Sequence, residues 1–324
     1  MIMKEQEKSK YAFQLEALNR RLSPLHKQKL LVLDALKKEL SGLKGQNALN
    51  FYLGFLPQEE YLIIHNLRLQ DANDFFEIDT LILCERYILL IESKNWYGTL
   101  HVDGEKQVIR VGDDGREEGF PNPIPQVKTQ RHRLQKWLNQ NCLPDIPLLY
   151  LVVISFPSTI LKPLYPNEPI PPAIIHSNSL FFKIIELNNE HTKKIIDTEA
   201  LKQLALELVN AHHPREVQVL QKFGIKKDEL VNGVFCPECG AVRMQRLHSK
   251  WYCSACSHVS KNAHVAALQD YKALVGDCIT NREARAFLLV ESSDVVKELL
   301  KNISKPSGKR KARKYEILIK SQIS

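Results

Sequence analysis

Residues 75–84 read Phe-Phe-Glu-Ile-Asp-Thr-Leu-Ile-Leu-Cys, and residues 87–95 read Tyr-Ile-Leu-Leu-Ile-Glu-Ser-Lys-Asn. Two apolar runs this short, joined by two polar residues, predict a β-hairpin. If the turn is centred on those two residues, Asp79 lies directly opposite Glu92, because paired positions in an antiparallel ladder keep a constant sum. Lys94 lies two residues further on the same face. The hairpin therefore predicts two carboxylates and an amine close together.

The chemistry of this group favours a metal site. Directly paired Cβ atoms lie roughly 5 Å apart, and two like charges there destabilise a sheet unless a cation lies between them. Carboxylate oxygens suit Mg²⁺ or Mn²⁺, which lowers the pKa of a bound water, and Lys94 would steady the hydroxide or the charge on phosphorus. Asp79 and Glu92 thus predict a metal-dependent phosphodiesterase site. The alternative is a charged strand end, because Glu92-Ser-Lys94 by itself could belong to any edge that faces solvent.

Composition indicates a modular protein. The chain has 324 residues, of which 44% are hydrophobic, enough for two or three domains. The first ten residues are too charged for a signal peptide, and the longest apolar run, at 148–154, is too short to span a membrane. We therefore expect a cytoplasmic protein without a membrane partner. The seven cysteines are an odd number and do not form a disulfide framework.

The segments around the hairpin predict an α/β domain with a mixed sheet. Helices are expected over residues 4–40 with a break near 23–24, and over 125–139, 181–187 and 198–212, with a short amphipathic segment at 47–56. Buried strands are expected at 62–65, 148–155 and 173–176. A charged, glycine-bearing loop is expected from 103 to 119.

Three ordered motifs in this region resemble the nuclease-related domain, NERD, a branch of the PD-(D/E)xK nucleases. They are Phe76-Glu-Ile-Asp-Thr-Leu-Ile82, Ile91-Glu-Ser-Lys-Asn-Trp-Tyr-Gly-Thr-Leu100 and Glu118-Gly-Phe-Pro-Asn-Pro-Ile-Pro-Gln-Val127. The resemblance covers residues 42–187 and implies a restriction-endonuclease-like αβββαβ core. It implies that Asp79 and Glu92 bind the metal, that Lys94 assists catalysis, and that Gln126 contributes to the same site. It also implies DNA rather than a small molecule as substrate.

One motif departs from the family. A Gly-x-x-Gly-Glu motif is usual on the first core helix, whereas this chain has Gly42-Leu-Lys-Gly45-Gln46. An amide brings no negative charge, so affinity for the metal should fall. The departure raises an alternative function, a catalytically impaired, non-enzymatic protein that binds DNA or regulates its use.

The strongest single motif lies further along the chain. Two Cys-x-x-Cys pairs, Cys236 with Cys239 and Cys253 with Cys256, are separated by thirteen residues. This spacing predicts a tetrahedral Zn²⁺ site that is closed by four thiolates and holds a small ribbon folded. Redox chemistry and iron are the alternatives. The basic residues on the hairpin between the pairs indicate nucleic acid or a solvated surface equally.

The C-terminal segment is basic. Residues 301–324 hold eight Lys or Arg against one acidic residue, a net charge of +7 out of +8 for the whole chain, which favours a polyanionic partner. Three helices are expected: one over 264–275, a second that begins at a capping box at 280–283 and ends near 289, and a third after 293. A basic hairpin follows the third helix. This pattern resembles a winged helix-turn-helix, with a helical bundle and a charged tail as the alternative. Its candidate DNA contacts are Lys297, Lys301, Lys309, Arg310, Lys311, Arg313 and Lys314.

Together these features predict five regions. They are N-terminal helices at 1–40, a nuclease-like domain at 41–213, a linker at 214–231, a zinc ribbon at 232–262 and a winged-helix-like domain at 263–324. The expected function is Mg²⁺- or Mn²⁺-dependent hydrolysis of DNA by a bacterial protein, with zinc as a structural ion.

Overall fold

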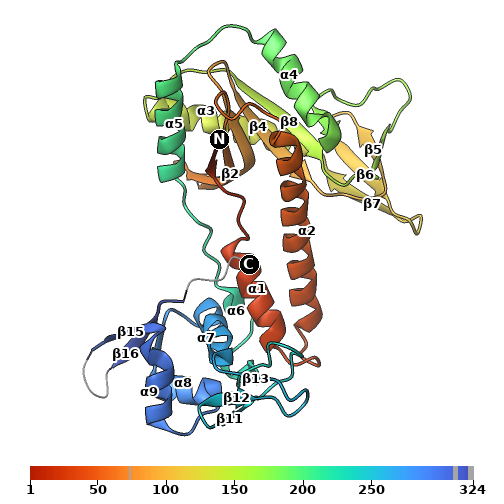
Figure 1. Cartoon of the computed structure of the whole chain (residues 1–324). Coiled ribbons are helices and arrows are strands. Elements are labelled where there is room, and N and C mark those ends of the chain that lie inside the picture. Colours follow the sequence, from red (N-terminus) through yellow and green to blue (C-terminus); the bar gives the residue numbers. More distant parts are fainter. Residues whose placement is uncertain (73, 309–312, 320–324) are drawn as a thin grey trace. The chain divides into compact units, whose positions relative to one another are not determined.

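The structure is a computed structural model that describes residues 1–72, 74–308 and 313–319. The chain divides into two compact units. The first comprises residues 1–7 and 39–214, and the second comprises residues 8–38 and 215–324. Figure 1 shows their helices and strands.

The first unit is built on a six-stranded mixed sheet with the order β1-β2-β3-β4-β8-β10. Its strands are β1 (Ile2–Lys4), β2 (Leu62–Gln70), β3 (Phe75–Leu83), β4 (Ile88–Lys94), β8 (Leu148–Ile154) and β10 (Ile174–His176). Neighbours β2, β3 and β4 pair antiparallel, whereas β4, β8 and β10 run parallel. The predicted α/β domain with a mixed sheet is confirmed, and its elements follow the αβββαβ order that the family resemblance implied.

Helices cover both faces of this sheet (Figure 1). Apolar residues of α3 (Pro123–Gln140) and α5 (Thr198–Asn210) share one core with Leu81, Leu83, Ile88 and Leu90 of the hairpin. The other core contains α4 (Leu180–Glu190), the end of α2 (Lys29–Leu53) and the opposite face of the same strands. Because both faces are buried, the strands are apolar almost throughout.

The register of the hairpin agrees with the prediction. Leu83 pairs with Ile88, and the ladder continues regularly to Thr80 and Ile91. Beyond this pair the backbones of β3 and β4 no longer match as partners. There the Asp79 side chain, instead of a backbone carbonyl, accepts a hydrogen bond from the Ser93 N–H. The predicted face is thus kept, but Asp79 and Glu92 lie just past the end of the ladder.

The prediction of a loop at residues 103–119 is wrong. A second, four-stranded sheet with the order β7-β6-β5-β9 occupies this region. Its strands are β5 (Thr99–Asp103), β6 (Gln107–Val111), β7 (Glu117–Pro121) and β9 (Ile160–Pro163). Each strand has only four or five residues, so periodicity gives a weak signal, and the charges and glycines of the turns dominated the pattern.

The second unit has its own core, which the cysteine ribbon and the C-terminal helices share. Its elements are α1 (Lys10–Arg21), α6 (Val219–Lys222), a 3-10 turn η2 (Lys227–Glu229), β11 (Gln245–Leu247), β12 (Lys250–Tyr252), β13 (Val259–Ser260), α7 (Ala263–Leu274), β14 (Cys278–Thr280), α8 (Asn281–Leu288), α9 (Ser293–Lys301), β15 (Ser304–Ser307) and β16 (Lys314–Ile317). The capping box of Thr280 and Glu283 begins α8 as predicted.

The N-terminal segment differs from the expected run of helices. Residues 2–4 form strand β1, because their backbone pairs with β2. Helix α1 ends at Arg21, near the predicted break, and belongs to the second unit. There the buried Arg21 guanidinium donates from Nε to Asp270 Oδ2 of α7 over 2.8 Å and from Nη1 to the carbonyl of Gly233 over 2.7 Å. A buried charge needs such partners.

In the described part of the chain, no helix is long and apolar enough to cross a membrane.

The packing of α2 against the central sheet depends on one glycine. A Cβ at Gly45 would lie 2.6 Å from Asn95 Cβ and from Ser155 Oγ, whereas a Cβ at Gly42, one turn earlier, would have nothing within 4 Å. Gly45→Ala should therefore lower the free energy of unfolding by about 1–3 kcal/mol through overpacking. Gly42→Ala should raise it by up to about 1 kcal/mol, because alanine is the better helix former. Urea unfolding of both variants tests this close approach, and equal effects would contradict it.

Candidate functional site

The carboxylate of Glu92 is the centre of the predicted site. The residue is 3% exposed and lies near the end of β4. Its Oε1 accepts hydrogen bonds from Lys94 Nζ (2.7 Å) and Gln126 Nε2 (2.8 Å), and its Oε2 accepts one from Gln130 Nε2 (2.9 Å). Lys94 Nζ also donates to Gln126 Oε1 over 3.1 Å. Three donors thus stabilise a buried negative charge that would otherwise be costly.

The start of helix α3 aims both glutamines at Glu92. Asn122 caps the helix, because its side chain accepts a hydrogen bond from the Ile124 N–H over 2.9 Å. The same side chain donates to the carbonyl of Gly104 over 2.8 Å and so fixes the cap against the β5–β6 turn. Residues four apart share one face of a helix, so Gln126 and Gln130 reach the same carboxylate.

Asp79 lies beside this group. Its Oδ2 accepts hydrogen bonds from the Ser93 N–H (2.9 Å) and from Ser93 Oγ (3.0 Å). Desolvation and then the nearby charge of Glu92 raise the pKa of Asp79 to about 7, against the opposing effects of the Ser93 hydrogen bonds and the Lys94 charge. The two carboxylates therefore repel each other, as the hairpin geometry predicted.

These donors fit a divalent cation. Asp79 Oδ1 has no hydrogen-bond partner among the described residues, and Glu92 Oε2 accepts only one bond and has a second lone pair. A cation bound by these oxygens would relieve the repulsion that raises the pKa of Asp79. Oxygen donors of this kind suit Mg²⁺ or Mn²⁺.

The structure brings together all four residues predicted for this site, namely Asp79, Glu92, Lys94 and Gln126. Sequence reasoning missed Gln130 and Ser93. The four-residue spacing of Gln126 and Gln130 was the available signal for the first. Ser93 had no such signal, because its contact with Asp79 depends on where the ladder ends.

The altered glycine motif lies next to this group. Gly45 faces Asn95, the residue after Lys94, and Asn95 Nδ2 donates to the Ser41 carbonyl over 2.9 Å. Gln46 Oε1 accepts a hydrogen bond from Gln6 Nε2 over 2.7 Å. The amide is thus engaged with another amide, as a neutral side chain allows.

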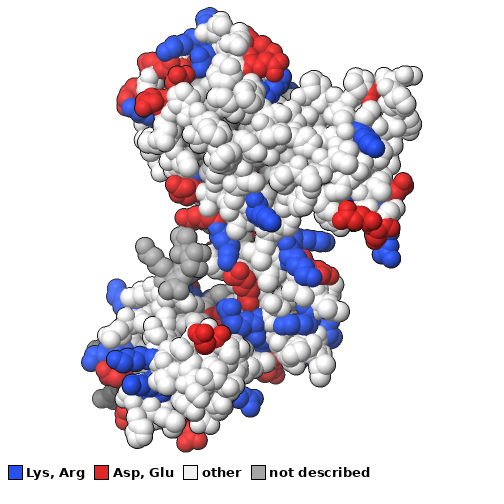
Figure 2. Space-filling view, turned by 45° about the vertical axis from the view of Figure 1, so that its right-hand side comes forward, with Lys and Arg blue, Asp and Glu red and all other residues white. Residues whose placement is uncertain are grey.

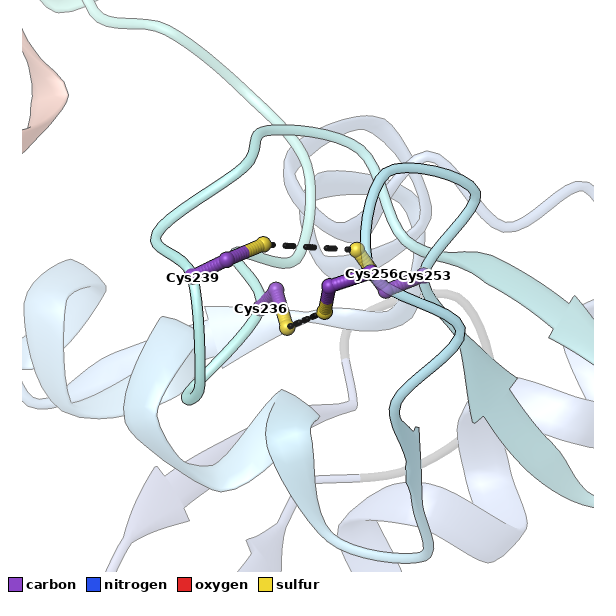
Figure 3. Close-up of side chains that lie close together, drawn as sticks. All are labelled: Cys236, Cys239, Cys253 and Cys256. Carbon is purple, nitrogen blue, oxygen red and sulfur yellow. Dashed lines mark hydrogen bonds between the residues drawn. The ribbon is translucent and has the colours of Figure 1, made fainter.

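The four cysteines of the second unit converge, as Figure 3 shows. Their sulfur atoms all lie within 4.8 Å of one another, with 3.6 Å between Cys236 and Cys256 and between Cys239 and Cys253. The Cys256 N–H, donating to the sulfur of Cys253, is the main cause that lowers the pKa of Cys253 to about 7. The cluster fits the predicted tetrahedral Zn²⁺ site.

The predicted DNA contacts are only partly described. On α9, Lys297 Nζ pairs with Asp294 at 2.7 Å and Lys301 Nζ pairs with Glu298 at 3.4 Å. Arg313, directly before β16, and Lys314, its first residue, are exposed. Lys309, Arg310 and Lys311 lie outside the described residues.

Comparison with known protein families identifies a domain within the first unit. The family described as the nuclease-related domain matches residues 41–155. This segment is a nuclease-related domain. It contains Asp79, Glu92, Lys94, Gln126 and Gln130, so the hydrogen-bonded group lies inside the matched region.

The chain was also compared with solved structures and with curated proteins. The crystal structure of protein VC1899 from Vibrio cholerae matches with 13% identity over 57% of this chain and a TM-score of 0.25. The match covers 53% of that protein, so the chain spans about half of its length. No curated protein matches the chain.

The shifted pKa of Asp79 should make stability depend on pH. Between about pH 4 and pH 7 the native protein keeps this proton while the unfolded chain has lost it, so the free energy of unfolding falls as the pH rises. Asp79→Asn removes the titration, so the stability of the variant relative to the wild type should grow from about pH 5 to about pH 8. Urea unfolding across this range is the measurement. Glu77→Gln, on the same strand but paired with Arg68 at the surface, should show no such trend.

Loss of one ligand should empty the zinc site. Cys253→Ser should lower the zinc content, measured by mass spectrometry of the purified protein, from about one ion per chain to near zero, and should lower the melting temperature. Cys278→Ser is the matched control, because Cys278 is exposed in the same unit and outside the cluster. An unchanged zinc content in Cys253→Ser would contradict the four-thiolate site.

Proposed function

We propose that the nuclease-related domain hydrolyses phosphodiester bonds of DNA with the help of Mg²⁺ or Mn²⁺. The observation that carries the proposal is the Glu92 carboxylate, which is buried, hydrogen-bonded by Lys94, Gln126 and Gln130, and close enough to Asp79 to raise its pKa. A purely structural ion pair does not need a second, repelling carboxylate beside it.

Each side chain has a role in this proposal. Asp79 and Glu92 would hold the metal, which when bound supplies charge that activates water and polarises the phosphate. Gln126 and Gln130 orient Glu92 through their hydrogen bonds to Oε1 and Oε2. Lys94 donates to Glu92 and to Gln126 and can direct its third N–H bond to a phosphate oxygen, where negative charge develops.

The second unit supports DNA as the partner. Helices α7, α8 and α9 precede or flank a three-stranded antiparallel sheet of order β14-β16-β15, an arrangement that fits the winged-helix proposal. Both lysines of α9 are paired with acids on the same helix, and the helix has two acids and two lysines, so α9 carries no net charge. Arg313, Lys314 and the basic run before them therefore carry the proposed phosphate contacts.

A non-enzymatic DNA-binding function is the second candidate. Its support is Gln46, which replaces the acidic residue of the family motif and is engaged with Gln6. This candidate predicts DNA binding that weakens with salt and no metal-dependent cleavage. Either function suits the cytoplasm, since all seven cysteines are free and thiolate zinc sites persist in reducing compartments.

A cleavage assay separates the two functions. Purified protein should convert supercoiled, linear or single-stranded DNA to shorter products when Mg²⁺ or Mn²⁺ is added. Glu92→Gln, which keeps the buried volume, and Lys94→Ala should each lower the rate on the order of 100-fold or more.

The control variants change one acidic residue and one lysine that lie outside the hydrogen-bonded group around Glu92. Glu186→Gln and Lys106→Ala change an exposed acid of α4 and an exposed lysine of the β5–β6 turn, and should leave the rate unchanged. Cleavage that survives Glu92→Gln would reject the assignment. DNA binding without any cleavage, in the wild type as in the variants, would favour the second candidate.

A further inference from the structure

Aromatic side chains continue directly from Lys94. Trp96 and Tyr97 follow β4, and their rings lie against rings from two other segments of the first unit. The Trp96 and Phe120 ring centroids are 5.1 Å apart with an interplanar angle of 31°, and those of Tyr97 and Phe156 are 6.3 Å apart. Tyr97 is 42% exposed, and the other three rings are partly exposed. We call these four residues the aromatic strip.

Two cations border the strip. The Arg110 guanidinium lies 4.6 Å from the Tyr97 ring centroid and 5.2 Å from that of Phe120, within the range of cation–π attraction. Lys94 Nζ lies 6.0 Å from the Trp96 centroid. The strip is therefore continuous with the carboxylate group, because the same lysine contacts Glu92 and Trp96.

The backbone holds the strip in place. Gly98 has a φ of +88°, and a Cβ there would lie 2.4 Å from the Val111 carbonyl oxygen, so only glycine lets β6 approach so closely. Thr159 Oγ1 donates to the Trp96 carbonyl, and the Ile160 N–H donates to the Gly98 carbonyl over 3.0 Å. The rings of Trp96 and Tyr97 thus project from backbone that β6 contacts on one side and residues 159–160 contact on the other.

We propose that the aromatic strip stacks an unpaired base of a single-stranded nucleic acid whose phosphodiester lies at Lys94. This inference rests on the proposed function and names its preferred substrate as a single strand or a frayed end. Aromatic side chains bind bases through their faces, and only unpaired bases can leave the stack at little cost.

The charges near the strip favour one strand over a duplex. Arg110 and Lys94 are each paired with a carboxylate, Glu118 and Glu92. The β6–β7 hairpin also carries exposed Asp113, Asp114 and Glu117 against one exposed basic residue, Arg116, and Figure 2 shows acidic side chains with a basic one beside them at the outer end of this sheet. A duplex laid across the strip would bring two phosphate backbones against these acids. Stacking should therefore supply most of the affinity there, with a weak dependence on salt.

Fluorescence anisotropy with labelled oligonucleotides tests the inference. The background is the full chain carrying Glu92→Gln, without added Mg²⁺ or Mn²⁺ and without chelators, which would remove zinc. In this background, Tyr97→Ala should weaken binding of a single-stranded oligonucleotide by about 5- to 150-fold. Binding of a blunt duplex of the same length should stay unchanged, because the proposed duplex contacts lie in the second unit.

Matched variants separate stacking from folding. Tyr97→Phe keeps the ring and should bind like the parent, and Phe182→Ala removes an exposed aromatic ring elsewhere in the same unit and should have no effect. Bound oligonucleotide should also quench tryptophan fluorescence in the parent but not in Trp96→Phe, since Trp137 and Trp251 are buried.

The outcomes distinguish this inference from the hydrolytic function. Equal single-strand binding by Tyr97→Ala and the parent would overturn it even if the wild type cleaves DNA. An equal loss of duplex and single-strand binding would overturn it as well. Selective loss of single-strand binding in a protein that does not cleave DNA would keep the aromatic strip as a binding surface and reject only the hydrolysis.

Discussion

The buried carboxylate of Glu92 is the constraint on which the first unit depends. A negative charge that is 3% exposed at the end of a strand needs donors, and three side chains supply them. Two come from α3, so the position of that helix is tied to its cap at Asn122 and to the β5–β6 turn that holds the cap. The structural demand and the proposed chemistry thus use the same atoms.

The second unit meets a comparable demand in another way. Its ribbon is too small to bury a core by itself, and Cys236, Cys253 and Trp251 pack into one core with the C-terminal helices. The proposed zinc would close this core from one side. The buried Arg21 also stabilises this core, because its guanidinium joins α1 to Asp270 and lies over the rings of Phe235 and Phe287. Ionic contacts of this kind fix which segments belong together.

The close approaches around Lys94 link catalysis and recognition in our proposals. Gly45 lets α2 reach Asn95, and Gly98 lets β6 reach the segment that carries Tyr97. Both close approaches involve residues 95–98, because Gly45 packs against Asn95 and Gly98 packs against the Val111 carbonyl. A reactive amine and a base-stacking surface on such a short segment would place a bound nucleotide without a large rearrangement.

The sequence by itself predicted the hairpin register, with Asp79, Glu92 and Lys94 on one face, and the cysteine cluster, because ladder pairing and ligand spacing are local rules. The αβββαβ order and the place of Gln126 beside these residues were implied by the family resemblance. The sequence did not determine the second sheet, whose strands are too short for a periodic signal, or the place of α1 in the second unit. Nor did it show that Gln130 and Ser93 bind the two carboxylates. Those contacts join segments far apart in the chain or depend on where a ladder ends. Only tertiary packing decides them, since a buried charge selects its partners in space rather than by distance along the sequence.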